Sequence, residues 1–388
     1  MAFSFGFSGD DIEEDPNDVQ EQSQQQQQQQ QAGGEESNAV PPPIPAKTHD
    51  LDELLSTLPS KISFSTLPLT SPAGHTTYLP RRALFDVRLQ LMAEDDLSPS
   101  HTCTSNPLSG LSDTDLQTNI YEGGYKTWEC SLDLARYLLD RGPRKDLDDM
   151  ARVDHVIEMG CGSALPTLVL WMYAIRERLG CYFTLTDYNE AVLRCVTLPN
   201  LLLAWVSCLG PEESAALFPD EGGNPLLPSR AAAPTTHEHG GVDAGAEEEE
   251  NADLYITPAL VSALKAFLAS TGISLTLVSG SWSPTSDLLP LIPSAPDLNT
   301  FILGSETIYS PASLTAFADA IVALMGRVKM GKTLVAAKRV YFGVGGSVDG
   351  FRLECSQRGC VASEIEFEGL GDGSDGGVRR CLVEVQMY

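Results

Sequence analysis

Short apolar runs and longer apolar segments alternate along the chain from residue 153 onward. The short runs have the length, the β-branched content and the flanking glycines of buried strands, and they cover 154–160, 181–188, 273–280, 300–305 and 332–340. Helices are predicted between them over 166–180, 189–205, 257–270 and 311–326, three with a proline or N-capping threonine at the start. This alternation predicts a parallel sheet with right-handed crossovers and helices on both faces. Pro199 falls inside the second helix and predicts a kink or two segments there.

The C-terminus departs from this alternation. Residues 361–368 (VASEIEFE) and 381–388 (CLVEVQMY) have a period of two and are joined by a Gly/Asp-rich stretch, which predicts an antiparallel hairpin. A dinucleotide-binding Rossmann domain would continue with a parallel strand. Five parallel strands followed by a hairpin instead resemble the class I, seven-β-strand, Rossmann-like methyltransferase sheet. The predicted fold class is therefore α/β of this type, with an N-terminal extension.

Two stretches have too few apolar residues to offset the entropy of ordering. Residues 1–50 are acidic and contain an uninterrupted glutamine run from Gln24 to Gln31, and residues 211–251 contain PSRAAAPTTHEHGGVDAGAEEEE. We expect a disordered tail over 1–50, an N-terminal extension over 51–114, and a folded domain over 115–388 that carries a disordered insertion at 211–251.

The chain is strongly acidic, with 25 Lys and Arg against 53 Asp and Glu and a net charge of −28. Such a chain lacks the basic footprint that nucleic acids need, so we expect no direct nucleic-acid binding and favour a basic protein as partner. The alternative is that the charge serves solubility alone. No apolar run reaches the roughly 18 to 20 residues of a membrane span, and the first residues lack the basic region of a signal peptide. We expect no membrane association and a monomer.

Cysteine and histidine usage bears on metal binding and on the compartment. The nine cysteines include no CxxC pair, and the six histidines include no zinc-ligand spacing. We expect reduced, structural cysteines and no metal.

A glycine turn follows the first strand. The stretch EMGCGSA (158–164) places Gly160 and Gly162 between strand and helix, where backbone N–H groups can approach a ligand closely. A tight structural turn is the alternative. Leu165 stands where the pattern GxGxxG needs glycine, which disfavours pyrophosphate binding.

The next two strands end in further candidates. Asp187 ends the second strand, where a carboxylate can accept from both ribose hydroxyls, although it could also serve only to start the following helix. Ser281 follows the third strand, where many methyltransferases have an acidic residue that binds the adenine amino group; a serine hydroxyl can still accept a hydrogen bond. Trp282 packs either on the adenine or in the core.

Four stretches resemble the eukaryotic protein-histidine N-methyltransferase family, which methylates a histidine of the ribosomal protein uL3. They are YEGGYKTWECSLDL (121–134), TDYNEAVLRCVTLPNLL (186–202), ILGSETIYSP (302–311) and KRVYFGVGGSVDGF (338–351). The resemblance covers 115–388, which makes this the methyltransferase domain. It implies S-adenosylmethionine as cofactor, uL3 as the basic partner, and a cytoplasmic and nuclear location.

The resemblance also implies roles for particular residues. The cofactor would be bound by Glu158, Gly160, Gly162 and Asp187, with Trp128 and the pair Gly123–Gly124 closing over it as a lid. Ala164 departs from the family pattern, where glycine is commoner, and costs little if its φ is negative. Glu122 or Glu129 is a candidate to face the ammonium end of the cofactor.

The loops after the fourth and fifth strands carry the predicted acceptor side, because ligands bind at the carboxyl ends of such strands. We expect Glu306 to accept a hydrogen bond from the target imidazole and Tyr309 to pack beside it; the alternative is that Glu306 only orders its loop. Phe342 would wall the pocket, and Gly343 and Gly345 would allow close approach or a hinge, unless they form a plain turn. The rival functions are lysine methylation on the same fold and a non-catalytic acidic chaperone for a basic ribosomal protein.

Overall fold

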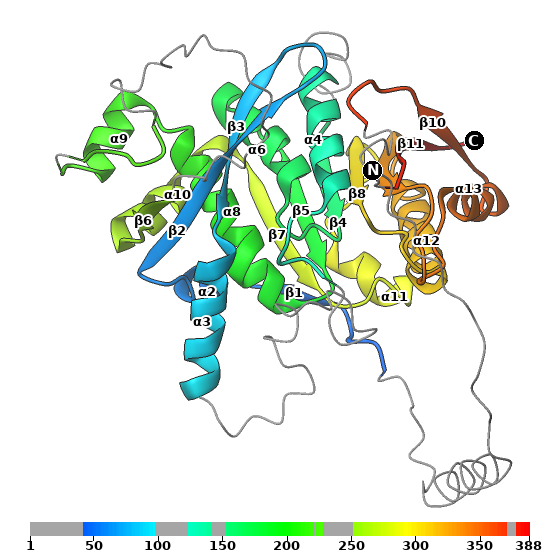
Figure 1. The fold of residues 1–388 in the computed structure, drawn as a ribbon, viewed down its shortest axis with the longest axis horizontal. Coiled ribbons are helices and arrows are strands. Elements are labelled where there is room, and N and C mark those ends of the chain that lie inside the picture. Colours follow the sequence, from blue (N-terminus) through cyan, green and yellow to red (C-terminus); the bar gives the residue numbers. More distant parts are fainter. Residues whose placement is uncertain (1–41, 98–122, 142–152, 221, 228–250, 371–377) are drawn as a thin grey trace, which may run out of the picture. The chain divides into compact units, whose positions relative to one another are not determined.

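Five parallel strands form the centre of the sheet in the computed structural model, which describes residues 42–97, 123–141, 153–220, 222–227, 251–370 and 378–388 (Figure 1). The strand order of the whole sheet is β1-β7-β5-β4-β8-β9-β11-β10. The parallel strands are β4 (His155–Met159), β5 (Tyr182–Asp187), β7 (Ser274–Ser279), β8 (Thr300–Ser305) and β9 (Gly331–Lys338). All five predicted strands are therefore confirmed, each within about two residues of its predicted bounds.

The C-terminal hairpin is also confirmed. β10 (Cys360–Ile365) pairs antiparallel with β11 (Arg380–Met387), and β11 pairs antiparallel with β9. The order from β7 to β10, with β11 as its one reversed strand, is that of the class I methyltransferase sheet, as predicted. An additional strand, β1 (Lys47–His49), pairs antiparallel with β7 at the other edge and was not predicted.

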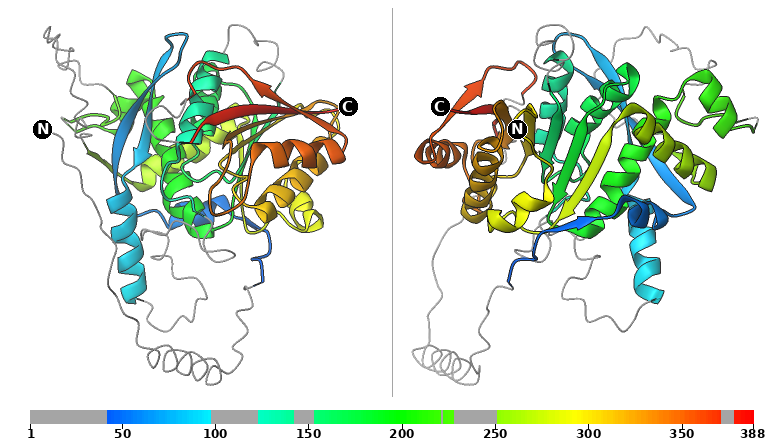
Figure 2. Two further views of the ribbon diagram at one scale, coloured as in Figure 1. Left: turned by 45° about the vertical axis from the view of Figure 1, so that its right-hand side comes forward. Right: turned by 180° about the vertical axis from the view of Figure 1, so that it is seen from behind.

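Helices cover both faces of this sheet. Consecutive strand residues point to opposite faces, and Val156 and Ile157 are accordingly buried in two different hydrophobic clusters, one on each face. One face packs against α4 (Glu129–Arg141), α6 (Leu165–Glu177), α8 (Leu198–Ser207) and α10 (Pro258–Thr271). The opposite face packs against α11 (Thr285–Leu288), the short 3₁₀ turn η3 (Leu289–Leu291), α12 (Pro311–Met325) and α13 (Val348–Gln357). In Figure 2, α12 and α13 lie beside the C-terminal hairpin. Helix α13 was not predicted.

The predicted break at Pro199 takes the form of a π-helical turn. The helical run consists of α7 (Glu190–Val192), the π-helix η2 (Leu193–Thr197) and α8. Since proline has no N–H, the carbonyl of Cys195 four residues earlier loses its ordinary partner. Arg82 Nη1 donates to that carbonyl at 2.8 Å instead. The run Glu190–Ser207 is long and apolar enough to cross a membrane by composition, but 78% of it is buried inside the fold, which explains its apolar character.

The N-terminal extension and the strand that directly follows the predicted insertion form a second sheet. Its order is β3-β2-β6, from β2 (Lys61–Thr70), β3 (Thr76–Arg82) and β6 (Ala252–Tyr255), and it lies beside α8 and α4 (Figure 2). The extension adds α2 (Leu51–Ser56) and α3 (Leu84–Leu97). Residues 42–388 therefore form one compact unit.

Two predicted boundaries differ from the structure. The predicted tail 1–50 includes β1, and the predicted disordered insertion 211–251 begins with helix α9 (Pro211–Leu217), whose Ser214 receives a hydrogen bond from the buried Asn224. A glutamate at the third helical position accepts from the Gly210 N–H and stabilises α9 at its start. The remaining parts of the predicted tail and the predicted insertion lie outside the described residues. The ranges outside are 1–41, 98–122, 142–152, 221, 228–250 and 371–377.

Arg82→Leu is expected to lower the free energy of unfolding by about 2 to 4 kcal/mol. The side chain is 1% exposed and donates to Cys195 and, through Nε, to Asp86 at 2.7 Å, so the variant leaves both acceptors without this donor. Denaturant titration measures the change. Arg379→Met, whose exposed side chain precedes β11, is the control and should stay within about 0.5 kcal/mol. An equally small effect at Arg82 would show that the carbonyl finds another partner.

Candidate active site

The glycine turn between β4 and α6 adopts a left-handed backbone at alternate positions. The φ angles are 66° at Gly160, 48° at Gly162 and 57° at Ala164. Ala164 thus has the strained conformation, not the negative φ under which alanine would cost little, so that expectation was wrong. A Cβ at Gly160 would lie 3.1 Å from Thr307 Cγ2, and a Cβ at Gly162 would lie 3.2 Å from Gly124 O. The turn has no room for side chains at these two positions.

Asp187 ends β5 and holds the turn in place. Its side chain is buried, with Oδ2 accepting from the Gly162 N–H at 2.9 Å and Oδ1 accepting from the Asn189 N–H at 3.2 Å. Asp187 therefore fixes both the glycine turn and the Asn189 backbone just before α7, while its contact with a ligand stays a prediction.

Glu158 lies within β4 beneath the turn and is fully buried. Its Oε2 accepts from the Thr167 N–H in the first turn of α6 at 3.0 Å, while Oε1 has no hydrogen-bond partner among the described residues. Burial raises the pKa of Glu158 to about 8, so the carboxyl is largely protonated at neutral pH. Glu158 therefore supports the helix N-terminus from below, and a direct cofactor contact stays a prediction.

The segment Gly123–Trp128 crosses over the turn, as expected for the lid. Both glycines have positive φ, and a Cβ at Gly124 would lie 2.9 Å from Val192 Cγ1 and 3.4 Å from Asp187 Oδ2. Thr127 Oγ1 donates to Ser163 Oγ at 3.2 Å. Leu134 and Leu138 of α4 are buried in the core and anchor the segment to the sheet. Gly124 thus lies against the turn, with Gly123 directly before it, whereas Glu122 lies outside the described residues.

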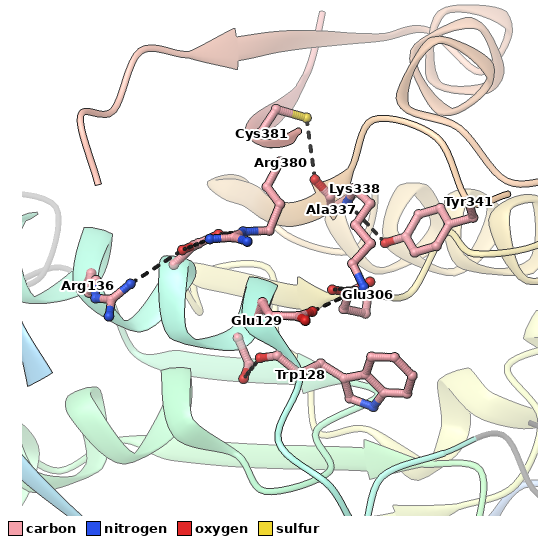
Figure 3. Close-up of polar contacts among 11 residues, drawn as sticks. Trp128, Glu129, Arg136, Glu306, Ala337, Lys338, Tyr341, Arg380 and Cys381 are labelled. Carbon is pink, nitrogen blue, oxygen red and sulfur yellow. Dashed lines mark hydrogen bonds and ion pairs between the residues drawn. The ribbon is translucent and has the colours of Figure 1, made fainter. Parts of the chain in front are cut away.

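A charged cluster lies beside Trp128 at the ends of β8 and β9 (Figure 3). Lys338 Nζ lies 3.1 Å from Glu129 Oε2, 3.7 Å from Glu306 Oε1 and 5.4 Å from the centre of the Trp128 ring. Glu306 follows β8 with a φ of 58°, and its carboxylate is 7% exposed. Neither of its oxygens has a hydrogen-bond partner among the described residues. A buried carboxylate with two open acceptor sites is costly unless it serves a ligand or is balanced by a charge.

The groups that face Glu306 respond to its charge. Burial, followed by the effect of Glu306, raises the pKa of the Cys130 thiol and of the Tyr341 hydroxyl, so both stay protonated. Burial alone would lower the pKa of Lys338, but Glu306 and Glu129 together raise it, so this lysine stays charged. The Glu306 carboxyl group thus lies between the Lys338 ammonium and two neutral groups, the Cys130 thiol and the Tyr341 hydroxyl.

Relatives of the chain point to one enzyme class. The chain is 34% identical over 367 residues to "Histidine protein methyltransferase 1" of Saccharomyces cerevisiae, covering 90% of this chain and 89% of that protein. The Schizosaccharomyces pombe protein of the same name is 33% identical over 348 residues, covering 89% and 83%. The chain belongs to the histidine protein methyltransferase 1 family. A homologue from Bos taurus is 27% identical over 281 residues, covering 71% of this chain and 58% of that protein. No family model matches the chain.

Membership of the histidine protein methyltransferase 1 family makes the protein a protein-histidine methyltransferase with S-adenosylmethionine as cofactor. The residues present fit that cofactor. Gly160 and Gly162 allow a tight turn at the start of α6, packed against Thr307 and Gly124, and the buried Asp187 carboxylate lies next to it, which is the arrangement of a nucleoside site at strand ends. In the part of the chain that the structure describes, no group of three or more His, Cys, Asp or Glu side chains could hold a metal.

Two further predicted cofactor residues of this methyltransferase are already engaged. Ser281 donates its N–H to Ile44 O at 2.8 Å and accepts from the Ser283 N–H through Oγ at 3.1 Å. Trp282 packs against the core beside Phe317 and donates Nε1–H to Thr186 Oγ1 at 3.1 Å. Of its two alternatives, the structure favours core packing for Trp282, with its ring edge directly under Gly160.

The acceptor-side loops contact each other through backbone atoms. Gly346 donates to Tyr309 O at 2.9 Å, and a Cβ at Gly346 would lie 2.0 Å from Ile308 O, so only glycine fits there. Gly343 and Gly345, the predicted glycines, have positive φ within a turn closed by Gly345 N–H donating to Tyr341 O at 3.0 Å.

This tight turn directs Phe342 outward, where it is 78% exposed and forms no wall. Tyr341, one residue earlier, is the aromatic side chain that faces Glu306. The loop thus keeps its predicted place beside the Glu306 loop, but a different aromatic residue points inward.

Several residues of the site were missed at the sequence level. Lys338 ends β9 next to the strand of Glu306, and its position at the carboxyl end of a parallel strand was an available signal. Thr197 and Asn200 gave no such signal. Thr197 Oγ1 donates to Gly162 O at 2.7 Å and Asn200 Nδ2 donates to Ser163 O at 2.9 Å, which depends on the π-helical turn.

The stability of the cofactor-free protein is expected to depend on Glu158. Between pH 4.5, the ordinary pKa, and about 8, the folded protein holds a proton that the unfolded chain has lost. Stability therefore falls as pH rises through this window, by up to about 1.4 kcal/mol per pH unit from this group. Glu158→Gln should remove that part of the slope, measured by denaturant titration at several pH values.

The matched control is Glu177→Gln at the exposed end of α6, which should leave the slope unchanged. Because other groups also titrate, the difference between variant and wild type is the quantity compared. Equal slopes in Glu158→Gln and wild type would mean that Glu158 is ionised in the folded protein.

Proposed function

We propose that the protein methylates a ring nitrogen of a histidine in the ribosomal protein uL3, and that Glu306 holds the acceptor imidazole. The observation that carries the role of Glu306 is its buried carboxylate, whose two oxygens lack hydrogen-bond partners among the described residues. The uL3 assignment rests on the family resemblance and on charge. A net charge of −28 favours a basic protein partner.

The chemistry that S-adenosylmethionine supplies when bound is an electrophilic methyl group on a sulfonium. Neutral imidazole has a free lone pair on one nitrogen and an N–H on the other at physiological pH, since its unperturbed pKa is about 6.5. The enzyme therefore has to select the tautomer and aim the lone pair. A carboxylate that accepts from the N–H does both, and it stabilises the positive charge that grows on the ring.

Glu306 is held for this role by its surroundings. Its left-handed backbone lies directly after β8, and the Glu306 N–H donates to Ala336 O of β9 at 3.0 Å. Lys338, which contacts Glu129 as well, balances the carboxylate charge from one side at 3.7 Å. Cys130 and Tyr341 limit its access to water. A carboxylate fixed in this way needs little reorganisation when it meets an imidazole.

The proposed acceptor is tested by labelling. Purified enzyme, methyl-labelled S-adenosylmethionine and purified uL3 are incubated, and the labelled peptide is sequenced by mass spectrometry. The expected result is label on a single histidine, lost when that histidine is replaced by alanine. Label on lysine would support the lysine alternative. Stable binding of uL3 without transfer would support the non-catalytic chaperone, and either outcome overturns the proposal.

Glu306→Gln is expected to lower kcat by about 10²-fold or more, because the amide cannot provide the negative charge. The dissociation constant of S-adenosylhomocysteine should change less than about twofold, since the proposed contact is to the acceptor. Isothermal titration gives the affinity and the labelling assay gives kcat. Glu177→Gln is again the matched control. Equal loss of kcat and of cofactor affinity would assign Glu306 to ordering its loop.

A further inference from the structure

The N-terminal residues 42–49, here called the strap, cross the carboxyl end of β7. β1 within the strap pairs antiparallel with β7, with Lys47 opposite Ser279, so the residues before Lys47 extend beyond the strand end. His49 Nε2 and Ser279 Oγ are 2.7 Å apart, and Glu190 lies 3.9 Å from Lys47 Nζ and 3.7 Å from His49 Nδ1. The strap therefore has fixed contacts at its C-terminal half.

Its N-terminal half is bound through backbone groups. The Ile44 N–H donates to Tyr188 Oη at 3.0 Å, and the Ser281 N–H donates to Ile44 O at 2.8 Å. Gly280 has a φ of 104°, and a Cβ there would lie 2.4 Å from Pro45 O. Only glycine permits this approach of the strap, so the contact at the end of β7 is a close and specific one.

The position of the strap follows from the order of strands. The glycine turn ends β4, Asp187 ends β5, and β7 is the next strand outward. A nucleoside whose ribose reaches Asp187 from the glycine turn extends its base toward the end of β7. There it meets Gly280, Ser281 and the strap. The Ser281 N–H is taken by Ile44 O, and Ser281 Oγ accepts from the Ser283 N–H, so the apolar side chains of the strap are the further contacts that this edge offers a base.

Ile44 and Pro45 provide apolar surface at this edge. Both are exposed, Ile44 by 37%. Exposed apolar side chains held by backbone hydrogen bonds next to a ligand crevice gain from being covered by a flat aromatic base. We propose that the strap forms the outer wall of the adenosine end of the S-adenosylmethionine site, and that cofactor and strap stabilise each other.

The test compares two truncations of the protein. One lacks residues 1–41, which leaves the strap intact, and the other lacks residues 1–46, which removes the contacts of Ile44 and Pro45. Titration calorimetry with S-adenosylhomocysteine and with adenosine is expected to show wild-type affinity for the first truncation. The second should bind both ligands about tenfold or more weakly, by a similar factor, because the lost wall contacts the adenosine part. Unchanged affinity, or loss confined to S-adenosylhomocysteine, overturns the proposal.

A point variant covers the case in which the longer truncation fails to fold. Tyr188→Phe removes the hydroxyl that accepts the Ile44 N–H and should weaken binding of both ligands about threefold, whereas Tyr182→Phe at the opposite end of β5 should not. Hydrogen exchange gives a second readout: S-adenosylhomocysteine should slow exchange at the Ile44 and Ser281 amides in the wild type. If S-adenosylhomocysteine does not change exchange at these two amides, and Tyr188→Phe binds it with wild-type affinity, the proposal is overturned. The strap would then serve only as an edge strand of the sheet.

The proposal rests on the cofactor of the family and not on the choice of acceptor. No acceptor protein is present in these titrations, so their failure would leave histidine methylation untouched. Conversely, failure to methylate uL3 would not change the affinity of either truncation.

Discussion

The buried carbonyls of the glycine turn impose the constraint on which the site depends. A chain that bends sharply enough to bring its N–H groups to a ligand turns its carbonyls inward, where each needs a donor. Gly162 O accepts from Thr197 and Ser163 O accepts from Asn200, both fully buried. Both donors come from one helical run, and they are presented where it passes from η2 to α8. The irregular helix therefore supports the glycine turn, which fits the tendency of π-helical turns to occur at functional sites.

Charge at the acceptor side is balanced in a different way. The Glu306 carboxyl group is buried without a hydrogen bond from the described residues and lies 3.7 Å from the Lys338 ammonium, in surroundings where electrostatic interactions are strong. Lys338 at the end of β9 forms ion pairs with Glu306 and with Glu129 of α4, and its ammonium lies over the Trp128 ring. One lysine thereby connects the predicted lid, at Trp128, with the predicted acceptor residue. A change in the lid can therefore reach Glu306 through a single side chain.

The sequence predicted the regular part of this molecule well. Strands with clear apolar periodicity, helices with proline at their first turn, and the terminal hairpin all follow from local patterns that burial enforces. The glycine turn and Asp187 followed from the same logic, because they sit at strand ends. What failed depends on distant contacts: β1 is a three-residue strand that exists only through its pairing with β7, and β6 is a four-residue strand that needs β2. The outward turn of Phe342 depends on hydrogen bonds within its loop, and the positive φ of Ala164 on the packing around it.

The N-terminal extension is connected to the glycine turn through a short series of strand pairings and hydrogen bonds. β6 leads out of the insertion and pairs with β2, β2 pairs with β3, and β3 ends at Arg82. The Arg82 N–H donates to Asn200 Oδ1 at 2.7 Å, and the same amide side chain donates to Ser163 O. Asn200 is thus oriented by the second sheet before it can orient the turn. A side chain whose two ends are both hydrogen-bonded loses little further freedom when a ligand arrives, so the second sheet preorganises the glycine turn through Asn200.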